Sequence, residues 1–436
     1  MVALDYAVTN LPAPEQGARL SVGVLVDLEL SPQAGGHVKC WERLARAARA
    51  FPDQLDLTVH FTGPKPAVEV LGPNVRYVIE PCVLSTARFR VLSHVPDHTD
   101  LSPYHPRLAR ALRSYQVIHT TDAFFSYART AARVARRTGI PLVTSVHTNT
   151  PEYSRMYTRL TIERLFGRGV VSRFMLDRLA LDRAVERRML AQLDEHQRRC
   201  AFTFVSRPEQ LEPAERALGG RAGLLRRGIE RELFTPQRRN RAWLAQAYGI
   251  PIERTVVLFV GRLNRGKNVL LLADAVAALV ADGLDLQVVC AGVGDQREAV
   301  LATLGARATC PGSVPPEELA RLYASADLFA LPSEIEESAN VVLEALASGL
   351  PVLVTRESGM GRAVVEGETG LTLPGAARDA WATAIGELTR DAGRRLHMAR
   401  AAQRYAELNL PSWEDVLAED LLPHWQEAAA SRSSGL

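Results

Sequence analysis

Short apolar runs alternate with longer helical patterns along the chain, and this alternation limits the possible folds more than any other feature. The runs consist almost entirely of Val, Leu, Ile and Phe, which is typical of strands buried on both faces. Alternation of such strands with helices predicts parallel, doubly wound sheets. The expected strands cover residues 21–27, 57–61, 116–120, 141–147, 202–206, 255–261, 286–292, 326–333 and 350–355.

The alternation stops between about residues 207 and 250 and then begins again, which predicts two successive α/β domains. We assign residues 1–220 to the first domain and 221–410 to the second. The last segment, 411–436, contains the amphipathic pattern SWEDVLAEDLLPHWQEAA with no strand after it. We expect this helix to return to the first domain.

The composition excludes several classes of protein. The chain is 47% hydrophobic and 23% charged, as soluble globular proteins are, and it contains no apolar stretch long enough to span a membrane. Its N-terminus lacks the basic and apolar regions of a secretory signal. The five cysteines are scattered and form no CxxC pair, so neither a disulfide framework nor a zinc site is expected. A cytoplasmic protein fits these features.

Charge is distributed unevenly. Residues 101–231 hold 24 arginines, no lysine and 12 acidic residues. Such a block predicts an anionic partner or, alternatively, a solvated face of an arginine-rich protein. Within it, residues 150–200 have a helical pattern with arginine at every fourth or fifth position among Met, Tyr, Leu and Phe. This segment either rests on an anionic membrane and presents a lipid acceptor or forms a solvated helical hairpin.

Lysine occurs only three times in the chain, and Lys267 is the only one in the second half. It belongs to GRLNRGKN (261–268), which follows an expected strand and precedes an expected helix. Backbone N–H groups at the helix start, together with Arg262 and Lys267, predict an anion site suited to a diphosphate. The alternative is a pair of surface cations. The loop lacks the residue order of a Walker A motif.

The stretch EESANVVLE (336–344) carries two glutamates eight positions apart. If a helix begins near Asn340, the carboxylate of Glu344 is directed back towards the preceding loop. It then suits a vicinal diol such as a ribose, while Glu336 suits the hydroxyls of a second sugar. The N–H groups of residues 338–341, including Ser338 and Ala339, lie between them. The alternative is a capping carboxylate and a hydrogen-bonded core glutamate.

Other polar and glycine residues follow the expected strands, at the edge where α/β sheets bind ligands. In the first half these are Gly35, Gly36, Asp122 and His147, and in the second half Gly294 follows the strand at 286–292. The sequence around Gly294, CAGVGDQ, is only half of a dinucleotide-binding motif. The chain has no GxSxG motif, which disfavours an α/β-hydrolase, and no metal-binding DxD motif, so no metal is expected.

These motifs resemble family 4 of the retaining glycosyltransferases. The resemblance rests on GRLNRGKN, on YASADLFALPSEIEESANVVLEALASGLPVLVT and on GETGLTLP, with further likeness in RRGIERELFTP, SWEDV and the Gly35–Gly36 loop. It implies the GT-B fold, in which two Rossmann-like domains face each other across a cleft. It also implies an acceptor-binding first domain, a second domain that binds a nucleotide-sugar donor, and no cofactor or metal.

The resemblance implies roles for individual residues. Arg262 and Lys267 would bind the donor diphosphate and Glu344 the ribose, while Glu336 would contact the transferred sugar. His147 would lie near the anomeric centre, unless it is only a structural histidine. Glu336, His147, Arg262 and Lys267 form the predicted catalytic set. The donor-binding set adds Ser338, Ala339, Asn340, Glu344 and Gly294, and the predicted acceptor or phosphate loop comprises Gly35, Gly36 and Asp122.

The sequence departs from the family pattern in two loops. Glu337-Ser338-Ala339 stands where glycine usually follows the first glutamate, and 359–362 reads GMGR. We therefore expect an altered sugar pocket. The expected activity is transfer of a sugar, with retention, to a hydroxyl of a glycolipid, polysaccharide or small acceptor, in the cytoplasm or at the inner face of its membrane. The alternatives are a non-catalytic GT-B protein that binds nucleotides or polyanions and a nucleotide-sugar epimerase.

Overall fold

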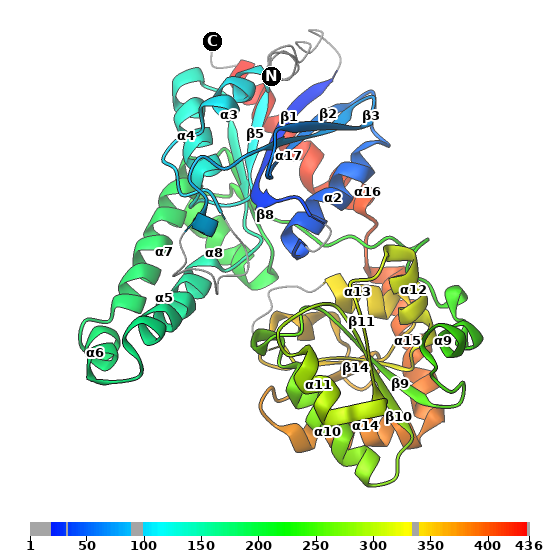
Figure 1. Ribbon diagram of the computed structural model, residues 1–436. Helices are drawn as coiled ribbons and strands as arrows, with labels where there is room; N and C mark the ends of the chain where they lie inside the picture. The colour runs from blue at the N-terminus through cyan, green and yellow to red at the C-terminus, as the bar shows by residue number, and fades with distance from the viewer. Residues whose placement is uncertain (1–18, 32–33, 89–98, 334–339, 434–436) are drawn as a thin grey trace. The chain divides into compact units, whose positions relative to one another are not determined.

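The computed structural model describes residues 19–31, 34–88, 99–333 and 340–433. The chain folds into two compact units (Figure 1). Unit 1 contains the chain up to Arg226 and again from Trp413 onward, and unit 2 contains Arg227–Ser412. The chain therefore leaves unit 1 once and comes back to it for its last segment.

Unit 1 is built on an eight-stranded sheet with the order β3-β4-β2-β1-β5-β6-β7-β8. All neighbouring strands are parallel except β3 and β4. The order changes direction at β1, whose neighbours are β2 and β5, so the switch point where such sheets bind ligands lies there. The strands are β1 (Leu20–Glu29), β2 (Leu55–Thr62), β3 (Ala67–Gly72), β4 (Val75–Glu80), β5 (Val117–Thr120), β6 (Leu142–Ser145), β7 (Phe202–Val205) and β8 (Ala222–Leu224).

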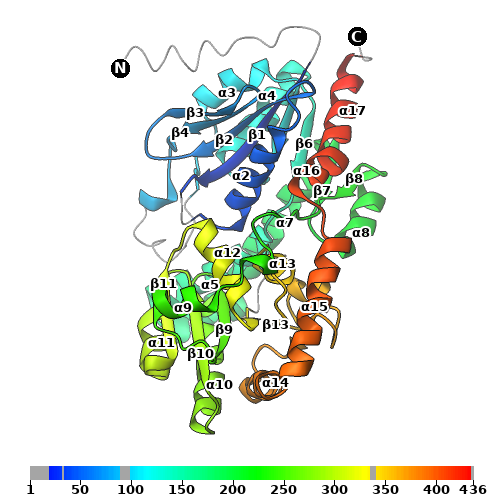
Figure 2. The ribbon, with the colours of Figure 1, turned by 90° about the vertical axis from the view of Figure 1, so that its right-hand side faces the viewer.

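Helices and the returning C-terminal segment cover this sheet. Trp41, Trp413 and Trp425 are buried in one hydrophobic cluster with the β1 and β2 side chains, so α2 and the last segment share a core with the sheet. Figure 2 shows α17 alongside the strands of unit 1. The helical elements are η1 (Thr86–Arg88), α2 (Gly36–Ala48), α3 (Pro106–Ala111), η3 (Leu112–Ser114), α4 (Ser126–Thr138), α8 (Pro208–Leu218), α16 (Trp413–Asp415), the π-helical η9 (Val416–Leu421) and α17 (Leu422–Ser433).

A helical hairpin is inserted between β6 and β7. It consists of α5 (Thr150–Phe166), α6 (Val170–Arg173), the π-helical η4 (Phe174–Arg178) and α7 (Leu181–Arg199). Helices α5 and α7 pack against each other, and α6 lies at the end of the hairpin away from the sheet (Figure 1). His196, near the end of α7, is hydrogen-bonded to Thr120 Oγ1 of β5 at 2.9 Å, which ties the base of the hairpin to the sheet.

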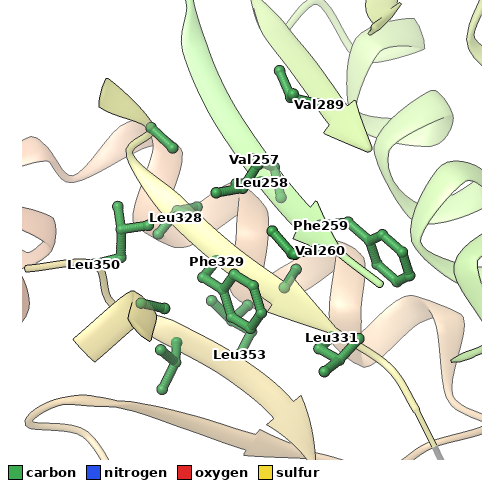
Figure 3. Packing of buried hydrophobic residues seen from close by; sticks show 14 of the residues in the cluster. Val257, Leu258, Phe259, Val260, Val289, Leu328, Phe329, Leu331, Leu350 and Leu353 are labelled. Carbon is green, nitrogen blue, oxygen red and sulfur yellow. The ribbon is translucent and has the colours of Figure 1, made fainter. Parts of the chain in front are cut away.

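Unit 2 contains a fully parallel six-stranded sheet with the order β11-β10-β9-β12-β13-β14. Its switch point lies between β9 and β12. Val257, Leu258, Phe259, Leu328 and Phe329 are fully buried at the centre of the sheet (Figure 3). The strands are β9 (Thr255–Val260), β10 (Leu286–Ala291), β11 (Ala308–Gly312), β12 (Leu328–Leu331), β13 (Val352–Thr355) and β14 (Gly370–Leu373).

Helices flank this second sheet. Helix α9 begins at the Asn240 cap, whose side chain accepts a hydrogen bond from Trp243 N, and it ends at Gly249 in the left-handed region. The helical elements of unit 2 are η5 (Pro236–Arg238), α9 (Arg241–Tyr248), η6 (Arg265–Lys267), α10 (Val269–Ala281), α11 (Arg297–Leu304), η7 (Gly305–Arg307), α12 (Pro316–Ser325), α13 (Asn340–Ala347), η8 (Gly359–Ala363), α14 (Arg378–Arg390) and α15 (Ala392–Asn409).

All nine strands expected from the sequence are present, and the parallel α/β prediction is confirmed. Five further strands were not expected: β3, β4, β8, β11 and β14. Four of them, β3, β8, β11 and β14, lie at sheet edges, and β8 has only three residues. Edge strands do not need a continuous apolar run, because only part of their surface is buried.

Candidate functional site

In unit 2, the loop after β9 places two cations at the switch point of the sheet. Strand β9 ends at Val260, Gly261 follows with φ +152°, and Arg262 leads into η6 and then α10. The side-chain oxygen of Asn264 accepts a hydrogen bond from Lys267 N at 3.2 Å and closes the turn. The GRLNRGKN segment therefore folds as the strand, turn and helix start that the sequence predicted.

Lys267 is partly buried in this turn, and its environment disfavours its charge. Burial and, to a smaller extent, the nearby positive charge of Arg262 together lower the pKa of Lys267 to about 8. Neighbouring cations in a desolvated turn repel each other, and a bound anion would reduce that repulsion. The arrangement suits a ligand with concentrated negative charge.

The loop after β12 lies against this cationic turn. Ser333, fully buried just after β12, donates a hydrogen bond to Gly266 O at 3.1 Å. Helix α13 begins at Asn340, as the sequence predicted. Glu336, Ser338 and Ala339, predicted to contact the donor, lie outside the described residues.

Glu344 lies in the middle of α13 and is buried. Its Oε2 accepts a hydrogen bond from the Tyr323 hydroxyl of α12 at 3.0 Å. The carboxylate is thus held by a neighbouring helix, as a core glutamate would be. Its predicted contact with a ribose stays a prediction.

Gly294 supports the same loop through close backbone packing. A Cβ atom at Gly294 would lie 2.1 Å from Leu263 O, and one at Gly292 would lie 1.9 Å from Gly261 O. Leu263 N also donates to Val293 O at 2.9 Å. Glycine at 294 is required by the backbone of the cationic loop, whereas its predicted contact with a donor stays a prediction.

In unit 1, the glycine loop lies beside His147. Gly35 precedes α2 and Gly36 is its first residue, and the ring of His37 stacks on that of His147 with 4.5 Å between ring centroids. His147 Nε2 accepts a hydrogen bond from Trp41 Nε1 at 3.2 Å and lies 2.7 Å from Ser145 Oγ. Gly35, Gly36 and His147, predicted separately, are therefore neighbours.

Asp122 has its own local partners. Its Oδ1 accepts hydrogen bonds from Phe124 N at 2.7 Å and Phe125 N at 3.1 Å, in the loop before α4. Burial raises the pKa of this carboxyl despite those bonds. Asp122 shapes its loop, and a role in acceptor binding stays a prediction.

Two regions of the sequence match families of known proteins. Residues 34–210 match the description Glycosyltransferase Family 4, and residues 254–391 match Glycosyl transferases group 1. Together they span more than half of the chain. The chain belongs to glycosyltransferase family 4. The resemblance found in the sequence motifs is confirmed.

Curated members of the family share part of this sequence. D-inositol 3-phosphate glycosyltransferase of Corynebacterium urealyticum is 37% identical over 201 residues, which are 43% of this chain and 47% of that protein. The protein of the same name from Salinispora tropica is 36% identical over 228 residues, 48% of this chain and 46% of that protein. The chain spans about half the length of the curated relatives it matches.

Solved structures have the same fold as this protein over nearly its whole length. Sucrose-phosphate synthase from Thermosynechococcus elongatus has a TM-score of 0.68 and 20% identity, with 94% of this chain and 100% of that chain covered. Anabaena HepE in complex with UDP and glucose has a TM-score of 0.60 and 18% identity, with 95% and 100% covered. The predicted GT-B fold with two Rossmann-like domains is confirmed.

Several residues of these sites were not found from the sequence. Ser333 contacts the cationic loop at Gly266, Tyr323 contacts Glu344 and Trp41 contacts His147. Tyr323 and Ser333 belong to the quoted segment YASADLFALPS, but none of the three was assigned a role from the sequence. Across the described ranges, no helix is long and apolar enough to cross a membrane. Within the same ranges, no three His, Cys, Asp or Glu side chains are grouped to hold a metal ion.

Proposed function

We propose that the protein transfers a sugar from a nucleoside-diphosphate sugar to a hydroxyl acceptor, with retention of the anomeric configuration. The observation that carries this proposal is the pair Arg262 and Lys267 at the switch point of unit 2, with the ammonium of Lys267 desolvated. The solved HepE structures hold UDP and UDP-glucose, which makes a uridine nucleotide the first donor to test. The curated relatives are named for D-inositol 3-phosphate, which makes that compound the first acceptor to test.

The chemistry follows from where charge develops. When the bond between the sugar and the diphosphate breaks, negative charge accumulates on the leaving diphosphate. Arg262, Lys267 and the backbone N–H groups at the start of α10 would stabilise that charge, which is the largest contribution in many transferases. In this proposal Glu344 and Glu336 bind the hydroxyls of the donor, the Gly35–Gly36 loop serves the acceptor side, and His147 lies near the anomeric centre.

A thermal-shift panel of UDP, GDP, ADP and TDP and their common sugars tests the donor site. A ligand at 100 times its dissociation constant adds roughly 2.7 kcal/mol of stability. One nucleotide should raise the melting temperature of the wild type but not of Lys267→Met. Lys65→Ala is the matched control, because Lys65 is an exposed lysine of unit 1.

Product analysis decides the reaction. With the nucleotide sugar identified, transfer to an added acceptor and retention in the product are expected. An epimerised nucleotide sugar formed without acceptor would refute transfer in favour of epimerisation. Binding of the nucleotide with neither transfer nor slow hydrolysis would indicate a non-catalytic binding protein.

We also propose that the end of the helical hairpin rests on an anionic membrane and that the protein acts there from a reducing compartment. The hairpin tip, residues 164–179, exposes six large apolar side chains at 50–76% of their surface: Leu165, Phe166, Val170, Val171, Phe174 and Leu179. Four exposed arginines lie among them, Arg164, Arg168, Arg173 and Arg178, with only one acidic residue, Asp177. Apolar side chains surrounded by arginines suit the interface of an anionic bilayer. All five cysteines are free.

Vesicle sedimentation tests this contact. The wild type should bind vesicles containing phosphatidylglycerol and not vesicles of phosphatidylcholine alone. Phe166→Ser/Phe174→Ser and Arg168→Glu/Arg173→Glu should each weaken binding, whereas Leu408→Ser should not, because Leu408 is an exposed leucine of α15 in unit 2. If the tip variants bind these vesicles as well as the wild type does, the proposed contact of the hairpin tip with an anionic membrane is refuted.

A further inference from the structure

A line of buried hydrogen bonds crosses unit 1 from its C-terminal helix to His147. Trp425 Nε1 of α17 donates to His119 Nδ1 of β5 at 2.9 Å. His119 Nε2 lies 2.8 Å from Ser145 Oγ at the end of β6, and Ser145 Oγ lies 2.7 Å from His147 Nε2. All four side chains are at most 6% exposed, so water does not compete for these bonds.

The sheet register produces this alignment. His119 pairs with Val143 between β5 and β6, so Ser145, two residues further along β6, is on the same face. Phe204 of β7 stacks parallel to the His119 ring, with 5.9 Å between centroids, which fixes the plane of the imidazole. Segments more than 300 residues apart in the sequence thus meet in one line.

The direction of each bond follows from the chemistry of the groups. An indole N–H can only donate, so His119 Nδ1 is an acceptor. His119 is neutral, because complete burial lowers its pKa to about 3. Its single proton is therefore on Nε2 and is donated to Ser145 Oγ. Ser145 Oγ, which accepts that bond, then donates its own hydroxyl hydrogen to His147 Nε2.

Trp41 reaches the same nitrogen from another side. Its Nε1 donates to His147 Nε2 at 3.2 Å, and its indole is fully buried in α2. A ring nitrogen that accepts from two donors holds no proton of its own. In neutral His147 the proton must then be on Nδ1.

We propose that Trp425, His119, Ser145 and Trp41 are positioning residues that hold His147 in the tautomer protonated on Nδ1. His147 then meets a ligand as a neutral hydrogen-bond donor and does not accept a proton at Nε2. The ligand role rests on the proposed function, whereas the tautomer does not. Through Trp425, the returning helix α17 contributes a hydrogen bond to this line in addition to its packing in unit 1.

Nitrogen NMR of protein labelled with ¹⁵N-histidine measures the tautomer directly, with His147→Asn identifying the His147 signals. In the wild type, Nε2 should resonate as an unprotonated imidazole nitrogen and Nδ1 as a protonated one. The opposite pattern would overturn the proposal.

Removing the hydrogen-bond donors tests whether they determine the tautomer of His147. Ser145→Ala/Trp41→Phe deletes both groups that donate to Nε2, so the tautomer protonated on Nε2 should become populated. The matched control is Trp413→Phe. Like Trp425, Trp413 is buried in the C-terminal segment, but its Nε1 has no hydrogen-bond partner among the described residues. If the double variant cannot be purified folded, Ser145→Ala alone should still shift the Nε2 signal. A spectrum unchanged by the removal of these donors would overturn the proposal.

Activity supplies a separate measurement. An Asn amide places an N–H near the position of Nδ1, and a Gln amide places it near that of Nε2. His147→Asn should therefore retain about tenfold more kcat than His147→Gln, the size expected for one hydrogen bond. The reverse order would contradict the donor role. A wild type that transfers no sugar would refute the proposed function, but the NMR result would still decide the tautomer.

Discussion

Replacing Lys267 by methionine should stabilise the free protein while it abolishes donor binding. Lys267 is partly buried beside Arg262, and its pKa falls from 10.5 to about 8 on folding. That difference corresponds to about 3 kcal/mol by which folding disfavours its charge. Partial exposure reduces the effect, so we expect Lys267→Met to raise the free energy of unfolding by about 1–2 kcal/mol at pH 7.

The lowered pKa of Lys267 also determines how the stability gain of Lys267→Met changes with pH. Between about pH 8 and 10.5 the folded protein has released the Lys267 proton and the unfolded chain still holds it. The unfolded state therefore binds more protons in this window, and the contribution of Lys267 to stability becomes more favourable as pH rises. The advantage of Lys267→Met over the wild type should be full below pH 8 and should disappear towards pH 10.5.

Urea unfolding of both proteins without ligand, from pH 7 to 10, measures this difference, and Lys65→Ala controls for the loss of any lysine. Calorimetry with the nucleotide identified in the thermal-shift panel then measures binding. A bound diphosphate favours the charged ammonium, so wild-type affinity should fall above about pH 8. A Lys267→Met protein that is less stable at pH 7, or that binds the nucleotide as the wild type does, would refute the reasoning.

Further predictions concern the groups around the cationic turn. Tyr323→Phe removes the hydrogen bond to the buried Glu344 and should cost about 1–3 kcal/mol in urea unfolding, because it leaves a buried carboxylate with one partner fewer. Wild-type stability in this variant would mean that the bond contributes nothing. Gly294→Ala should disrupt the loop and weaken nucleotide binding, because its Cβ would overlap Leu263 O. Gly36→Ala, with nothing within 4 Å of its Cβ, should fold with unchanged stability, and equal behaviour of the two glycine variants would contradict the packing argument.

The parts of the fold that were predicted are those that local sequence determines. The run at 256–260 is buried on both faces, so each residue had to be apolar and the strand could be identified. Strand β3 has mostly exposed or partly exposed residues, and β11 contains Pro311, so neither has the pattern of a central strand. The sequence therefore indicated the centre of each sheet better than its edges.

The residues of the candidate site likewise include some that could be predicted from the sequence and some that could not. Lys267 could be found because it is a rare residue type in a short segment between a strand and a helix. The partners of His147 could not, because Trp41, His119 and Trp425 are brought to it by sheet register and by the return of α17. A tryptophan in a core is ordinarily explained by packing alone. Only the position of its N–H distinguishes packing from a polar role.

The two units also differ in how they prepare for a ligand. In unit 2 burial and the nearby Arg262 disfavour the charge of Lys267, so an anion bound there gains binding free energy by relieving that cost. In unit 1 the hydrogen bonds around His147 are already formed, and both indoles donate into the line with no charge to compensate. Binding to unit 2 should therefore stabilise the fold strongly and depend on pH near 8. Because the His119 side chain stays neutral far above its pKa of about 3, its hydrogen bonds to Trp425 and Ser145 should be independent of pH through the neutral range.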